Sequence, residues 1–156
     1  RPELVIALRG TREPRVGTAL VDLYAADEDP RVRAKAAFVL GEGGEQWPPL
    51  LVERARVTAR LDLESDDPLL ITGAGDVLGI PPLSTPDRDL LIRTLRGEAN
   101  QGARARSTAL RALAAAKVVP ATLGPALEEV ARDSSASPEL RAQARSILKS
   151  LAGGPK

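Results

Sequence analysis

The sequence predicts an all-α fold, an α–α superhelix of about four helical hairpins closed by a terminal capping helix. Four apolar triads, each spaced for one helix face, follow one another at steps of 38, 35 and 35 residues, a period typical of stacked helical hairpins. The triads are Val32, Ala36 and Leu40; Leu70, Ala74 and Leu78; Ala105, Ala109 and Leu113; and Leu140, Ala144 and Leu148. Aromatic residues make up only 2% of the chain. The interior must therefore be built from aliphatic residues and alanine, which favours helices over a β-sandwich.

Nine helices follow from this periodicity and from the residues that start and stop helices. Asp29, Asp67 and Ser137 each precede a proline, the arrangement of an N-cap residue followed by proline at the first helical position. Glycines after the triads mark helix ends. Pro125 falls in the first turn of its helix if Thr122 is the N-cap, so it does not break that helix. The predicted helices span residues 2–9, 14–25, 30–42, 48–62, 68–79, 86–97, 102–117, 122–133 and 138–152.

The repeat predicts a single domain at residues 1–152. Its repeats fall at about 1–26, 27–63, 64–98 and 99–134, with a cap at 135–152, and residues 153–156 are expected to form a flexible tail. The first helix lacks a capping residue, and its leading face needs a preceding neighbour, because each repeat of a solenoid buries its apolar surface only against adjacent repeats. We therefore expect the chain to be part of a longer protein. The excess of arginine over lysine indicates a GC-rich genome.

Residues 24–41 carry the most distinctive motif of the chain. It consists of Asp29, Pro30, Val32, Arg33, Ala36, Leu40 and Gly41. This segment resembles a HEAT repeat, especially the short bacterial kind found in phycobilin lyase subunits. Arg106 and Arg141 repeat its arginine, whereas Ile71 replaces it in the second repeat. The resemblance implies an α-solenoid whose inner helices line a concave partner-binding surface, with the arginine tying neighbouring repeats together; it implies no chemistry.

Composition weighs against catalysis and against a bound metal or cofactor. The chain contains no histidine and no cysteine, so imidazole, thiol and disulfide chemistry are excluded. The acidic clusters at 27–29 and 64–67 precede helix N-termini, where capping and the helix dipole favour negative charge. Neither cluster has the spacing of a calcium loop. We expect a non-enzymatic protein with no cofactor and no metal.

A glycine motif at residues 69–79 resembles the phosphate-binding turn of a nucleotide-dependent dehydrogenase. The required strand, helix and strand context is missing, because Asp67 and Pro68 start a helix and no second strand follows. We instead expect Gly73 and Gly75 to permit close helix contact or a local bend.

Net charge and hydropathy give little information about where in the cell the protein resides. The formal net charge is +1, so no overall field draws the chain to nucleic acid or to an anionic membrane. No apolar stretch approaches the roughly 20 residues that span a bilayer, so we expect no membrane insertion. The compartment stays open, with the cytoplasm favoured.

The candidate partner-binding residues lie on the helices that we expect to be the inner ones. Acidic and basic residues share one face of helices 48–62, 86–97 and 122–133, so stacking would align them into arginine stripes, and a guanidinium offers a planar fork of donors to carboxylates or phosphates. The candidate residues are Arg56, Arg60, Arg93, Arg96, Arg132 and Trp47. The competing interpretations are a solvated face of intrahelical ion pairs for the arginines, and for Trp47 a hydrophobic staple on the next helix.

These observations favour a protein–protein interaction or scaffold module that uses its concave face. The partner is then another protein of unknown identity. One alternative is binding to the nucleic-acid backbone through the inner-helix arginines. A second alternative, an accessory subunit of a lyase or modifying enzyme, follows from the resemblance alone.

Overall fold

The computed structural model describes residues 1–153, and every regular element in that range is a helix. The α-helices are α1 (Pro2–Ile6), α2 (Pro14–Ala26), α3 (Pro30–Gly43), α4 (Pro49–Asp62), α5 (Pro68–Leu78), α6 (Thr85–Arg96), α7 (Ala103–Ala115), α8 (Gly124–Arg132) and α9 (Pro138–Ala152), with 3₁₀ turns η1 (Gly44–Gln46) and η2 (Pro120–Leu123). The all-α prediction is confirmed over these residues. Of the predicted flexible tail at 153–156, residues 154–156 lie outside the described part of the chain.

Helix starts follow the predicted capping chemistry. The side chains of Asp29, Asp67 and Ser137 each accept a hydrogen bond from a backbone N–H two or three residues ahead, at 2.8 to 3.1 Å, and proline follows each cap. The prediction for the eighth helix was wrong in one detail. Thr122 does not cap it but lies in η2, and α8 begins at Gly124 with Pro125 in its first turn, where a missing N–H leaves no hydrogen bond unmade.

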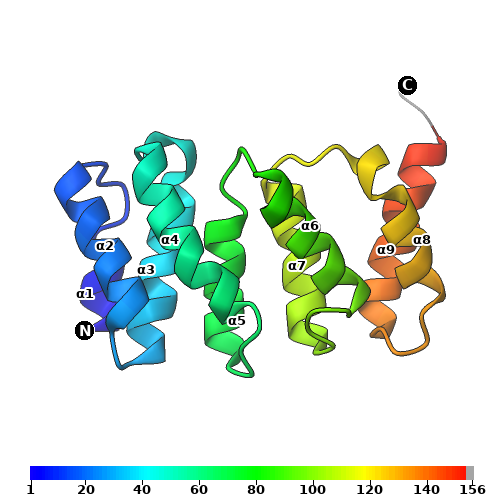
Figure 1. Ribbon diagram of the computed structural model, residues 1–156, viewed down its shortest axis with the longest axis horizontal. Coiled ribbons are helices and arrows are strands. Elements are labelled where there is room, and N and C mark those ends of the chain that lie inside the picture. The colour runs from blue at the N-terminus through cyan, green and yellow to red at the C-terminus, as the bar shows by residue number, and fades with distance from the viewer. Residues whose placement is uncertain (154–156) are drawn as a thin grey trace.

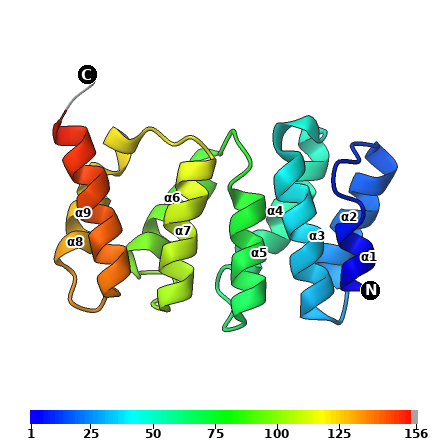
Figure 2. The same cartoon turned by 180° about the vertical axis from the view of Figure 1, so that it is seen from behind.

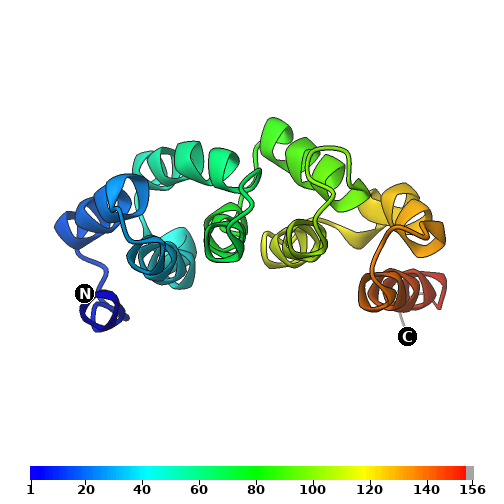
Figure 3. The ribbon, with the colours of Figure 1, turned by 90° about the horizontal axis from the view of Figure 1, so that it is seen from below.

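The helices form two layers that run along the whole molecule. Figures 1 and 2 show the row of helices from its two sides, with the N-terminus at one end and the C-terminal helix α9 at the other. Helices α2, α4, α6 and α8 make one layer, and α1, α3, α5, α7 and α9 make the other. Seen along the helices, the row is an arch, and the odd-numbered layer lies on its concave side (Figure 3).

The apolar triads lie between the two layers and form the core. Ten of their twelve residues are buried, and only Leu70 and Leu148 are half-exposed. The core extends through the other aliphatic residues of both layers from Val5 to Ala144. The aligned alanines allow the two layers to approach closely, because a methyl group fills little space between helices.

The expectation that residues 48–62, 86–97 and 122–133 are the inner helices was wrong. These segments are α4, α6 and α8, and Figure 3 places all three on the convex side of the arch. The inner side of an arch has the shorter arc, so its helices must pack more closely than those outside. The alanines and glycines of α3, α5 and α7 meet that condition where these helices contact one another.

Candidate functional site

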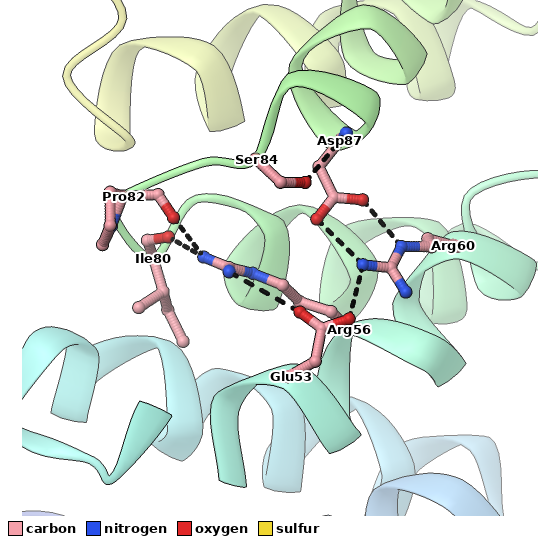
Figure 4. A network of polar contacts seen from close by, with 7 residues as sticks. All are labelled: Glu53, Arg56, Arg60, Ile80, Pro82, Ser84 and Asp87. Atoms are coloured by element: carbon pink, nitrogen blue, oxygen red, sulfur yellow. Dashed lines mark hydrogen bonds and ion pairs between the residues drawn. The ribbon is translucent and has the colours of Figure 1, made fainter. Parts of the chain in front are cut away.

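The predicted site residues Arg56 and Arg60 belong to a network that joins α4 to the start of α6 (Figure 4). Arg56 is only 8% exposed and donates to the carbonyl oxygens of Ile80 and of Pro82, the latter at 3.0 Å. Arg60 donates to both carboxylate oxygens of Asp87, at 2.6 and 3.0 Å. Glu53 supplies a second carboxylate to Arg60 at 2.8 Å. Both arginines are therefore engaged within the fold.

Asp87 is the buried carboxylate of this network, since its side chain is only 1% exposed. Burial by itself would raise the pKa of Asp87, but the hydrogen bonds and positive charge of Arg60 outweigh burial, and the pKa lies below its ordinary value. The same hydrogen bonds raise the pKa of Arg60. The pair is ionised, and each partner compensates the desolvation of the other.

Of the other predicted site arginines, two form ion pairs within the described residues and one does not. Arg96 on α6 forms an ion pair with Glu129 on α8, at 2.9 Å. Arg132 is paired with Glu128 on its own helix, at 3.4 Å. Arg93 is exposed and has no carboxylate within 4.0 Å in residues 1–153. The stripes are thus mostly ion pairs on the convex layer, and the pairs of Arg60 with Asp87 and of Arg96 with Glu129 join different helices, unlike the intrahelical pairs that the sequence suggested.

Trp47 cannot be an exposed anchor for a partner, so its place among the binding residues was wrong. Its side chain is only 2% exposed, and its indole Nε1 donates to the carbonyl oxygen of Leu40 at 3.0 Å. Gly17 and Gly43 lie against its ring, where a Cβ on either residue would collide with it. Trp47 packs in the turn between α3 and α4 against α2 and the end of α3.

Two of the three arginines in this register tie successive hairpins together, as the resemblance implied, whereas the Arg141 side chain forms no hydrogen bond or ion pair within residues 1–153. Arg33 on α3 donates to the carbonyl oxygen of Tyr24 on α2 and to Asp62 at the end of α4. Arg106 on α7 does the same with Leu95 on α6 and with Asp133 after α8. Where Ile71 replaces the arginine, Asn100 bridges instead to the carbonyl oxygens of Leu63 and Ser65, at 3.1 and 3.4 Å.

Glycines set the spacing of the concave layer. A Cβ on Gly41 of α3 would lie 2.7 Å from the carbonyl oxygen of Asp76 on α5, and one on Gly73 would lie 3.0 Å from the Cβ of Ala37. A Cβ on Gly75 would overlap the methyl group of Thr108 on α7. The glycine motif at 69–79 therefore serves close helix contact, one of the two roles expected of it.

The residues at these contacts grow larger toward the C-terminal end of the concave layer. In repeat register, Ala37 on α3 faces Gly73, and Gly75 on α5 faces Thr108. The next pair in register, Leu110 on α7 and Gln143 on α9, is bulkier on both sides. Both of these side chains line a pocket of about 590 Å³. Helices α7 and α9 thus stand apart where α3, α5 and α7 pack closely.

Three neighbouring pockets make the concave layer a continuous hollowed surface. The largest is the α7–α9 pocket, and pockets of about 280 and 340 Å³ lie along α3 and α5. Thr72, Asp76 and Arg111 each line two of the three. We call this surface, from Lys35 on α3 to Ile147 on α9, the concave groove. It is the candidate functional site.

Arg111 and Asp76 lie at the centre of the concave groove. The Arg111 guanidinium donates to Asp76 at 2.8 Å and to the carbonyl oxygen of Thr72 at 3.3 Å. Burial raises the pKa of Asp76 above its ordinary value, although the hydrogen bond and charge of Arg111 oppose the rise. Sequence reasoning missed this site because it placed α3, α5 and α7 outside. The change from the small Ala37 and Gly75 to the large Leu110, read at the repeat period, was the available signal.

The described residues define an all-helical protein of two packed layers, and three adjoining pockets hollow its concave layer. Within residues 1–153, no helix is long and apolar enough to cross a membrane, and no group of three or more acidic residues is arranged to hold a metal ion. Comparisons with protein-family models, with curated proteins and with solved structures found no match to this chain. Its function is therefore argued from the groove itself.

Proposed function

We propose that this protein is a non-enzymatic scaffold of the HEAT-type α-solenoid class, and that it binds a protein partner along the concave groove. The observation that carries the proposal is the series of three adjoining pockets on one face of a regularly packed helical array. Stacked hairpins create such extended surfaces without any preformed chemistry. The repeated arginine joints support a solenoid, because Arg33 and Arg106 each donate to a carbonyl oxygen of the preceding hairpin, that of Tyr24 and that of Leu95.

A protein partner is favoured over nucleic acid by the distribution of charge. Binding to a phosphate backbone requires several unpaired cations in one track. The arginines considered for that role are mostly paired with carboxylates, as Arg60 is with Asp87 and Arg96 with Glu129. In the concave groove, Arg111 is paired with Asp76, so few cations are left for phosphates.

Site-specific photo-cross-linking tests which face meets the partner. A photoreactive phenylalanine analogue is placed, one position at a time, on the concave layer at Lys35, Leu69 and Ser107, and on the convex layer at Val57, Arg93 and Arg132. All six side chains are exposed or half-exposed, so the substitutions preserve the core.

The proposal expects a discrete protein adduct from the concave positions in the source cells, insensitive to nuclease, with at most weak adducts from the convex ones. Adducts confined to the convex positions, or adducts that nuclease removes, would contradict it. Mass spectrometry of the adduct names the partner.

A further inference from the structure

The part of the concave groove between α7 and α9 has a chemistry of its own. Its lining combines aliphatic groups of Leu110, Ala114 and Ile147 with hydroxyl and amide groups, and its two charged side chains, Arg104 and Arg111, are both cationic. No carboxylate lines it. A volume of about 590 Å³ is in the range of pockets that bind a drug-sized ligand.

Arg104 is the side chain that gives this pocket a preference for anions. It is exposed on the first turn of α7 and, within residues 1–153, its guanidinium forms no hydrogen bond or ion pair. Arg111 already forms an ion pair with Asp76 at 2.8 Å. A ligand carboxylate near Arg111 would therefore be repelled by the carboxylate of Asp76. An incoming anion is therefore held at the Arg104 end of the pocket.

The apolar end lies just under two helical turns away. Leu110 is six residues after Arg104 on the same helix, which at 1.5 Å per residue is about 9 Å along the axis, and Ile147 of α9 lies on the same pocket. An extended peptide covers about 10 Å in three residues. The carboxamide of Gln143, which is not hydrogen-bonded within the described residues, can both donate to and accept from a peptide backbone.

We propose that the α7–α9 pocket binds an extended segment of the partner protein in which an acidic residue lies three positions from an aliphatic one. The acidic side chain pairs with Arg104, and the aliphatic side chain packs between Leu110 and Ile147. A peptide is favoured over an oligonucleotide because one free cation beside an apolar floor suits one carboxylate and one hydrocarbon side chain. This inference rests on the proposed function and specifies the partner chemistry for one end of the groove.

Titration of the whole ¹⁵N-labelled chain with defined peptides, followed by two-dimensional NMR, tests this inference. The probe is an acetylated, amidated nonapeptide with aspartate and leucine three positions apart among glycines and serines. Its twin carries asparagine in place of aspartate. The variants are Arg104→Glu and, as a matched control on the convex layer, Arg93→Glu.

The expected result is that amide shifts concentrate at Ser107, Leu110, Gln143 and Ile147. Affinity should fall about tenfold for the asparagine twin and for Arg104→Glu, the usual scale of one charge-assisted hydrogen bond, and stay unchanged for Arg93→Glu. Because the twin is tested on the native chain, the inference stays falsifiable even if Arg104→Glu is poorly folded.

Equal affinity for the two peptides, shifts on other helices or no shifts would overturn the inference. So would a twelve-residue oligothymidylate that shifts the same amides and depends on Arg104. If the peptides fail while Lys35 and Leu69 still cross-link a protein, only the peptide chemistry is wrong and the proposed function stands. If the concave positions also yield no protein adduct, the proposed function fails as well.

Discussion

One amino group of Arg33 lies within hydrogen-bond distance of both carboxylate oxygens of Asp62, at 2.7 and 2.8 Å. The contact joins α3 to the end of α4, and the Nε of the same guanidinium reaches the carbonyl oxygen of Tyr24 on α2 at 2.8 Å. Three helices from two successive hairpins thus meet at one arginine. Burial raises the pKa of Asp62, and the charge and hydrogen bonds of Arg33 oppose the rise.

Arg33→Gln is expected to lower the free energy of unfolding by about 2 to 3 kcal/mol, because the Asp62 carboxylate is left buried without its cation. Urea denaturation followed by circular dichroism measures the loss. The matched control is Arg54→Gln, which removes an ion pair of similar length with Asp22, and the two side chains of that pair are 56% and 63% exposed. It should cost less than about 1 kcal/mol. Equal losses at the two sites would contradict a structural role for the joint.

Arg60→Glu should destabilise the protein by about 3 kcal/mol or more, because it places a third carboxylate beside Asp87 and Glu53 and leaves Asp87 buried without its cation. Arg93→Glu should cost less than about 1 kcal/mol, the contribution of a cation at the C-terminus of α6. Thermal unfolding of the two variants makes the comparison. An unchanged melting temperature for Arg60→Glu would mean that the network in Figure 4 does not stabilise the fold.

Gly75→Ala should destabilise the protein by about 1 to 3 kcal/mol through overpacking, in spite of the better helix propensity of alanine. The added methyl group would overlap the Cγ2 of Thr108. Combining it with Thr108→Ser, which removes that Cγ2, should recover most of the loss. Gly124→Ala is the control, since nothing lies within 4 Å of a Cβ there. Chemical denaturation of the native chain, the two single variants and the double variant measures these differences. A stabilised Gly75→Ala variant would exclude close packing of α5 on α7.

The pKa of Asp133 predicts how the stability of the protein changes with pH. Hydrogen bonds from the side chain and backbone of Ser135, together with Arg106, lower the pKa of Asp133 to about 2, below the usual value of about 3.9. A carboxyl group whose pKa is lowered by folding stabilises the protein above pH 4, and that contribution is lost as the pH falls toward 2. The stability gap between the native chain and Asp133→Asn should therefore be full at pH 6 and close progressively below pH 4.

Urea midpoints at pH 6, 4, 3 and 2 measure that gap. Asp76→Asn serves as the contrasting control, because burial raises the pKa of Asp76 and its contribution to stability is greatest at low pH and is lost as the pH rises. The two gaps should change in opposite directions. A gap for Asp133→Asn that is independent of pH would show that the carboxylate form is not the one stabilised.

Local chemistry in the sequence was enough to predict the helices, their caps and the buried triads, because periodicity and N-cap residues act within a few positions of each other. The choice of concave layer was not local. It depends on which side of each hairpin packs more closely, and that is decided by contacts such as Gly75 on Thr108 between different repeats. Because α4, α6 and α8 lie on the convex side, the arginine stripes are ion pairs outside the groove. Arg104 and Leu110, which lie on the concave helix α7, belong to the candidate site instead.

Hydrogen–deuterium exchange of the chain, free and bound to the partner identified by cross-linking, tests the central claim most directly. If the concave groove is the binding surface, exchange should slow in α3, α5, α7 and α9 on binding and stay unchanged in α4, α6 and α8. Protection confined to α4, α6 and α8 would contradict the account, because it would place the partner on the convex layer.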